Sequence, residues 1–169
     1  MKKTTMVWLT IFSILIVIIS SAVYYFLRHP LFLYEKNYFE KIGIKGGRNY
    51  ENVIANKGEP IKKEINKSFF LAKYDGLELG FADKHPDIKD PPNIMSYAKI
   101  TGKQYRFGRQ KIGVGSTRKK VESVYKHIKK IIHLPDNQFG AIDGGKWVEY
   151  TFNEQNIVSE ITILVGGGP

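Results

Sequence analysis

The four histidines are the first side chains in this sequence that could carry catalysis or bind a metal ion. They are His29, His85, His127 and His133. The last two are separated by about 240° around a helix at about 100° per residue, so they cannot ligate one ion. The chain has no cysteine, which excludes disulfides, thiolate metal sites and a cysteine nucleophile. Because no catalytic triad order or paired-carboxylate motif stands out either, we expect no catalytic residues, no metal and no cofactor.

Oxygen ligands gather in the proline-rich stretch 83–93, DKHPDIKDPPN. Its aspartates lack the spacing and the distal glutamate of a calcium loop, and two interleaved lysines would repel a cation. We therefore predict a solvated loop. An unrecognised envelope hydrolase remains an alternative function, and it would need a cleft around this stretch.

Basic side chains precede and begin the helix that the sequence predicts from about residue 117 to 133. Cations are unfavourable at the positive end of a helix, so a cluster there suggests an anionic partner. The predicted anion-binding residues are Arg106, Arg109, Arg118, Lys119 and Lys120. The expected anionic surface is either phospholipid headgroups of the membrane or an acidic wall polymer. We expect no nucleic acid, because an exported domain would not meet it.

The composition is that of a folded, basic protein. The chain has 169 residues, a formal net charge of +10 and 43% hydrophobic residues, which excludes disorder of the whole chain. The part after residue 27 is long enough for one domain with a hydrophobic core.

The N-terminus carries 24 consecutive uncharged residues, Thr4–Leu27. A helix of this length covers about 36 Å, against about 30 Å for the hydrocarbon core of a bilayer. Lys2 and Lys3 precede it, which favours a cytoplasmic N-terminus and an exported body. We therefore predict a single-pass cell-membrane protein with an uncleaved signal anchor. Cleavage at the small residues Ser20-Ser21-Ala22 is the alternative.

The remaining sequence suggests a duplicated α+β domain. Each copy begins with glycine and a helix with an apolar stripe, and continues with strand signals. Asp75-Gly76 lies between two apolar runs, 68–74 and 77–82, and predicts a hairpin with a type I′ turn. The predicted units are a cytoplasmic stub and anchor (1–29), a juxtamembrane connector (30–44), an exported domain (45–166, repeats about 45–102 and 112–166) and a loose tail (167–169).

The repeated pattern resembles known envelope modules. Gly47–Pro60 with the hairpin Phe69–Phe81, and Gly113–Tyr125 with the hairpin Trp147–Ile163, are similar to the SmpA/OmlA outer-membrane-assembly lipoproteins and to the tandem repeats of beta-lactamase inhibitor proteins. The resemblance implies a two-repeat helix–β-hairpin domain with helices packed on one face of an antiparallel sheet. It also implies a small extracytoplasmic binding or assembly module rather than an enzyme.

The predicted function is therefore a membrane-anchored, extracytoplasmic binding or scaffolding module of the cell envelope. An inhibitor or immunity-type protein that acts on a secreted enzyme or toxin is the second possibility. The expected partner is an envelope protein, which would contact the sheet face or the exposed hairpins. The candidate partner-binding residues are Tyr74, Phe81, Trp147 and Tyr150.

Overall fold

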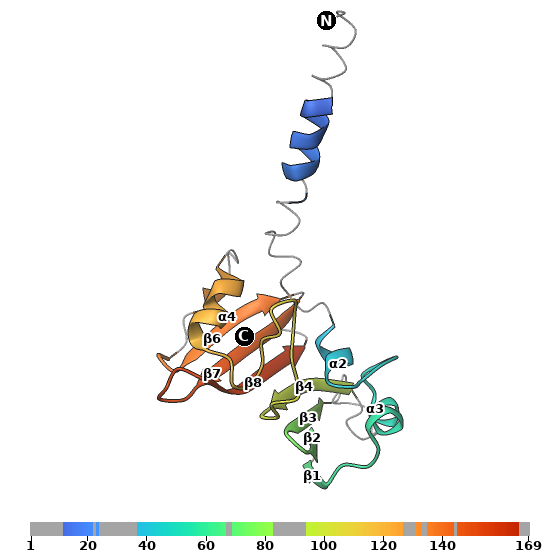
Figure 1. Ribbon diagram of the computed structural model, residues 1–169. Coiled ribbons are helices and arrows are strands. Elements are labelled where there is room, and N and C mark those ends of the chain that lie inside the picture. The colour runs from blue at the N-terminus through green and yellow to red at the C-terminus, as the bar shows by residue number, and fades with distance from the viewer. Residues whose placement is uncertain are drawn as a thin grey trace, which may run out of the picture.

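The body of the protein is built on one antiparallel sheet of eight strands, in the order β1-β2-β3-β4-β8-β7-β6-β5 (Figure 1). The computed structural model describes residues 12–21, 23, 37–66, 69–82, 94–126, 131–132, 135–143 and 145–165. The strands are β1 (Lys62–Asn66), β2 (Phe69–Tyr74), β3 (Leu77–Ala82), β4 (Ile94–Ile100), β5 (Ile131–Ile132), β6 (Gln138–Asp143), β7 (Lys146–Phe152) and β8 (Val158–Val165). Strands β1–β4 and β5–β8 follow one another as two meanders, and the pairing of β4 with β8 joins them.

Alternating burial along the strands separates the two faces of the sheet. In β7 the side chains of Val148, Tyr150 and Phe152 are buried, whereas those between them are partly exposed. This period of two is what a strand with one core-facing side requires. The core therefore lies on one face, which we call the inner face, and the opposite one is the outer face.

The predicted hairpin at Asp75-Gly76 is confirmed, because Tyr74 pairs with Leu77 across it. The predicted type I′ turn is wrong. Only Gly76 has a positive φ, 63°, and Asp75 does not, whereas type I′ needs both turn residues in that region. Gly76 is further constrained by the loop that follows β4, since its carbonyl accepts the N–H groups of Thr101 and Gly102 at 3.0 and 2.8 Å.

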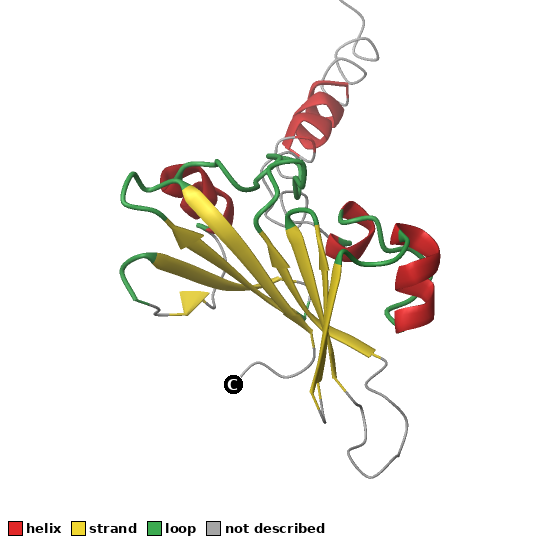
Figure 2. Cartoon of the chain, turned by 90° about the horizontal axis from the view of Figure 1, so that it is seen from below, coloured by secondary structure: helices red, strands yellow, loops and turns green. Residues whose placement is uncertain are grey.

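Three short helices complete the body: α2 (Tyr38–Lys41), α3 (Tyr50–Lys57) and α4 (Arg118–Tyr125). Asn49 and Thr117 cap α3 and α4 by accepting backbone N–H groups of the first turn. Tyr50 of α3 packs edge-on against Phe70 and Phe81, and Tyr125 of α4 packs against Tyr150. Their contacts place both helices on the inner face, and Figure 2 shows the helices beside the twisted sheet.

A chain of tyrosine hydroxyl groups ties α2, α4 and β7 together inside the core. The hydroxyl of Tyr125 lies 3.0 Å from that of Tyr38 and 2.9 Å from that of Tyr150. All three rings are at most 2% exposed. Residues of the predicted connector, including Tyr38 and Ile42, thus belong to the packed core of the body.

The predicted membrane-spanning helix and single-pass localisation are not supported. Of the segment Thr4–Leu27, the structure describes residues 12–21, which are helical, and residue 23. The helices in the described part of the chain are all too short, or not apolar enough, to cross a membrane. The rest of that segment, including Ala22 of the alternative cleavage site Ser20-Ser21-Ala22, lies outside the described residues.

The predicted fold of two helix–hairpin repeats behind a transmembrane helix is also wrong. α3 and α4 are each followed by four strands of one continuous sheet, and α2, α3 and α4 are only four to eight residues long. The second predicted helix was to run to His133, but α4 ends at Tyr125 and Ile131–Ile132 pair with β6 as a strand. Two β-branched residues fit a helical stripe and a strand equally well, so their periodicity could not decide between them.

Candidate functional site

The outer face of the sheet carries a continuous apolar row. Cross-strand pairing aligns Leu71 with Gly80, Gly80 with Tyr97, and Tyr97 with Leu164. Leu164 in turn pairs with Trp147, and Trp147 with Ile142. Side chains that face each other in this way lie about 4.5–5.5 Å apart at Cβ. We call these six residues the apolar row, and it crosses six neighbouring strands of the sheet.

The row is open to solvent and contains a groove. Ile142 is 38% exposed, and Leu71, Tyr97, Leu164 and Trp147 are partly exposed. An open groove of about 460 Å³ is lined by Phe69, Leu71, Glu78, Ser96, Tyr97 and Leu164. A Cβ atom added to Gly80 would lie only 2.9 Å from the Tyr97 ring and 3.0 Å from the Phe69 ring. Glycine therefore lets these two rings lie against the sheet backbone between them.

Charged side chains flank the row and are paired with one another. Lys73 bridges Glu64 at 2.9 Å and Glu78 at 3.3 Å, and Lys99 bridges Glu160 at 2.9 Å. These pairs neutralise most of the charge on the outer face. The apolar row therefore lies on a face with little net charge, although the chain as a whole has a net charge of +10.

Tyr97 stands where the apolar row meets these carboxylates. Partial burial raises the pKa of its hydroxyl, and the charges of Glu78 and Glu160 and a hydrogen bond to Glu78 raise it further. The hydroxyl is protonated at neutral pH, as in any tyrosine, and forms a hydrogen bond with the Glu78 carboxylate. With Glu78 and Ser96, it gives the groove polar groups beside its apolar wall.

The four aromatic residues predicted to contact a partner lie in different places. Trp147 belongs to the apolar row. Phe81 and Tyr150 are 0% exposed on the inner face, so their side chains are in the core and cannot reach a partner. Tyr74 is partly exposed, donates to the Gly58 carbonyl at 3.2 Å and holds Lys57 over its ring.

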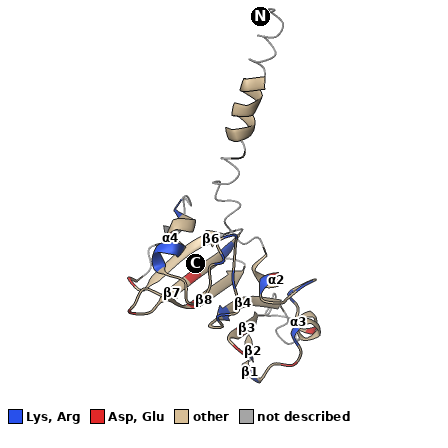
Figure 3. Cartoon of the chain, in the orientation of Figure 1, with Lys and Arg blue, Asp and Glu red and all other residues tan. Residues whose placement is uncertain are grey.

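The residues predicted to bind anions differ in exposure and in their contacts. Arg106, Arg109, Lys119 and Lys120 are exposed. Arg118 is engaged within the fold: its guanidinium pairs with Glu122 at 2.8 Å, lies 4.9 Å from the centre of the Phe152 ring and donates to the carbonyls of Asp136 and Gln138. It therefore fastens α4 to the sheet, and Figure 3 shows that the basic residues of this helix lie in its first turn.

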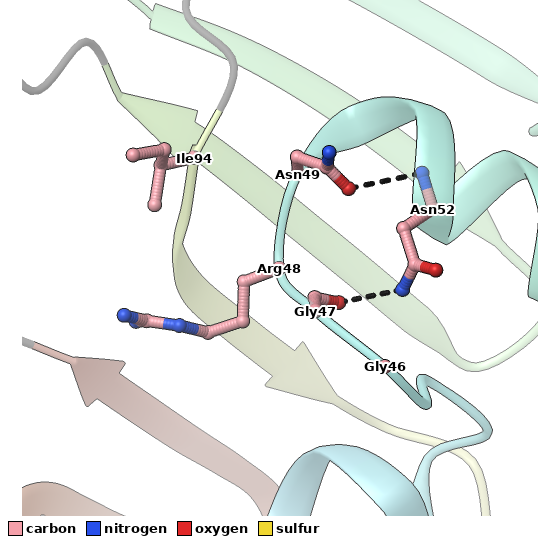
Figure 4. Close-up of a pocket in the computed structure, with 6 residues that line it drawn as sticks. All are labelled: Gly46, Gly47, Arg48, Asn49, Asn52 and Ile94. Carbon is pink, nitrogen blue, oxygen red and sulfur yellow. Dashed lines mark hydrogen bonds between the residues drawn. The ribbon is translucent and has the colours of Figure 1, made fainter.

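A second groove, of about 430 Å³, lies at the start of α3 (Figure 4). Its polar side chains bind the protein's own backbone. Asn49 accepts the N–H of Asn52 at 3.1 Å, and Asn52 donates to the Gly47 carbonyl at 2.8 Å. Arg48 points away from both and donates to the Met95 carbonyl at 3.3 Å. These contacts explain the local fold of the segment that leads into α3.

Within the described ranges, no three His, Asp or Glu side chains are grouped so that they could hold a metal ion. The aspartate-rich stretch 83–93, where a hydrolase cleft would be needed, lies outside the described residues.

Sequence reasoning found Trp147 but missed Leu71, Tyr97 and Leu164. Each is an apolar or aromatic residue at an outer-face position of its strand, where alternation would place a polar residue. This departure from alternation was the signal that could have identified them. Their alignment depends on β4 lying beside β8, which a single sequence does not reveal.

No protein-family model matches the chain, and no curated protein matches it. The crystal structure of an extracellular protein containing a SCP domain, from Bacillus anthracis, is similar with a TM-score of 0.54 and 15% identity. A DUF4309 family protein from Bacillus subtilis has a TM-score of 0.42 and 15% identity, and the match covers 70% of this chain and 78% of that one. A cysteine-rich secretory protein from Staphylococcus aureus has a TM-score of 0.49 and 11% identity, and the match covers 70% of this chain and 44% of that one.

The match to the Bacillus anthracis protein covers 70% of this chain but only 43% of that protein. At 15% identity it bears on the fold alone. The predicted resemblance to SmpA/OmlA lipoproteins and beta-lactamase inhibitor proteins is therefore corrected: the fold is similar to that of the Bacillus anthracis protein, and its sheet is one continuous sheet rather than two helix–hairpin repeats.

Proposed function

We propose that this chain is a non-catalytic, extracytoplasmic binding module that docks a protein partner on the outer face of its sheet. The observation that supports this most is the apolar row. An apolar stripe across six strands, on the face that the helices leave open, is the kind of surface that marks an interaction site. The Bacillus anthracis protein with a similar fold is described as extracellular, which agrees with the proposed location.

The chemistry of the face specifies its partner. Lys73 and Lys99 are already paired with carboxylates, so a strongly charged partner would have to break these pairs. We propose instead a protein segment with aliphatic or aromatic anchor side chains and little net charge. The groove beside Tyr97 would take one such anchor, and Trp147 would supply one in return.

Site-specific photocrosslinking in the producing cells tests the location of the interface. We expect a photoreactive residue at Ile142, in the row, to give a protein adduct. The control position is Glu154, which is also exposed and lies in the turn between β7 and β8. Equal adducts at both positions, or none at Ile142, would refute the proposed face.

The partner recovered in this way then allows a quantitative test. Trp147→Ala should weaken its binding by about 30-fold, equal to about 2 kcal/mol, as expected for a central aromatic anchor. Thr151→Ala, on the same strand and face but outside the row, should leave binding unchanged. An affinity that falls steeply with added salt would contradict recognition by an apolar surface. If the partner is an enzyme, loss of its activity in the complex would identify the module as an inhibitor.

A further inference from the structure

Positive charge is concentrated in residues 101–126, which we call the basic segment. Eight basic residues and one acidic residue give it a net charge of +7, compared with +10 for the whole chain. The basic residues are Lys103, Arg106, Arg109, Lys111, Arg118, Lys119, Lys120 and Lys126, and the acidic one is Glu122. The structure describes every residue of this segment.

Buried anchors hold the backbone of the basic segment in place. Phe107 and Ile112 exchange backbone hydrogen bonds of 2.7 and 2.9 Å, and both side chains are 2% exposed. They line a small internal space together with Val124 and Tyr125 of α4, so the turn between them packs beside that helix. The start of α4 is fixed in turn by the N–H of Arg118, which donates to the Asn156 carbonyl at 2.9 Å. The turn and α4 thus present their cations from one ordered scaffold.

The cations of the basic segment differ from those of the sheet in their pairing. All except Arg118 are exposed, and across the residues that the structure describes these seven form no ion pair. On the sheet, by contrast, Lys62, Lys73 and Lys99 are each within 2.9 Å of a carboxylate. The fold therefore neutralises the sheet and leaves the charge of the basic segment available to a partner.

The aromatic residues interleaved with these cations are used inside the protein. Phe107 is buried, with its ring centre 5.0 Å from that of Tyr38. The Tyr105 ring lies beside the Lys57 ammonium group, 5.7 Å from its centre. Binding of single-stranded nucleic acid relies on such rings as stacking platforms for bases, and these two are not free to serve. What the segment offers is charge distributed over a turn and a helix.

We propose that the basic segment binds a linear polyanion without bases, a chain of phosphate groups, through charge alone. Each cation that meets a phosphate releases counterions, so the logarithm of the affinity should fall linearly with the logarithm of the salt concentration. This inference goes beyond the proposed function, since it concerns another surface and a salt-sensitive interaction. Either proposal can fail while the other holds.

The test is binding of the full chain to long-chain inorganic polyphosphate over a range of salt concentrations. Lys119→Gln combined with Lys120→Gln should lower the affinity about tenfold at low salt and reduce the slope of the salt dependence by about 1.4, at about 0.7 per lost contact. Lys45→Gln combined with Lys62→Gln is the matched control. It removes the same charge from exposed positions in the α3 and β1 part of the protein and should leave the slope unchanged.

Four results would overturn the proposal. The first is an equal loss in both double variants, because net charge rather than this surface would then decide the affinity. The second is inhibition by orthophosphate at an equal phosphate concentration, which would indicate a single-anion site. The third and fourth are tighter binding, at equal charge, to single-stranded oligo(dT) or to vesicles containing anionic phospholipid. Unchanged thermal unfolding of the variants, expected for exposed substitutions, separates a loss of binding from a loss of structure.

Discussion

Replacement of Gly76 by alanine tests how tightly the β2–β3 turn is built into the body. An alanine at φ 63° carries backbone strain of about 1–2 kcal/mol. Its Cβ would also lie 2.4 Å from the Gly102 Cα and 2.7 Å from the Gly102 nitrogen. These are backbone atoms, so one of the two loops must move, at a further cost of about 1–3 kcal/mol. We therefore expect Gly76→Ala to lower the free energy of unfolding by about 2–5 kcal/mol.

Gly145→Ala is the matched control for this prediction. Gly145 lies in the turn between β6 and β7 at φ 75°, and an added Cβ would meet nothing within 4 Å. Gly145→Ala should therefore lower the free energy of unfolding by the backbone strain alone, about 1–2 kcal/mol. Urea unfolding of both variants, with equal denaturant slopes, provides the comparison. Equal losses of stability in the two variants would refute the close approach of Gly76 to Gly102 in the loop that follows β4.

Two further predictions concern tyrosines. Tyr125→Phe removes hydroxyl contacts of 3.0 and 2.9 Å inside the core. At about 0.5–1.5 kcal/mol per hydrogen bond, it should lower the free energy of unfolding, measured in urea, by about 1–3 kcal/mol. A decrease of only a few tenths of a kcal/mol would contradict the chain of hydroxyl groups. Burial raises the pKa of Tyr74 to about 12 and also raises the pKa values of Tyr97 and Tyr105. Above pH 10 the unfolded chain therefore loses tyrosine protons that the folded chain keeps, so stability should fall between about pH 10 and 12. Urea midpoints across this range measure the fall, Tyr97→Phe should reduce it, and a rise in stability would contradict the burial of these hydroxyls.

Local signals predicted the local elements of this fold. The hairpins at residues 69–82 and 146–165 follow from alternation and turn residues, and the structure confirms both. The end of α4 and strand β5 could not be predicted, because Ile131 and Ile132 suit a helix face as well as a strand. The role of Arg118 was missed for a related reason: its carbonyl acceptors on Asp136 and Gln138 come near it only in the folded chain.

The candidate site depends on long-range register. The outer-face positions of Tyr97 and Leu164 follow from alternation within each strand, but their contact requires β4 to lie beside β8. In the same way, Phe81 and Tyr150 have the residue type of a binding surface, and only the position of the helices shows that they face the core.

The solvent exposure of Trp147 reports directly on whether a partner docks on the outer face of the sheet. The chain has two tryptophans, so Trp8→Phe leaves Trp147 as the single tryptophan, whose fluorescence can be excited selectively. The account predicts that acrylamide quenches its fluorescence in the free protein and that the crosslinked partner, added at saturation, shields it. Quenching that is unchanged in the complex would place the partner elsewhere and contradict a docking surface on the outer face of the sheet.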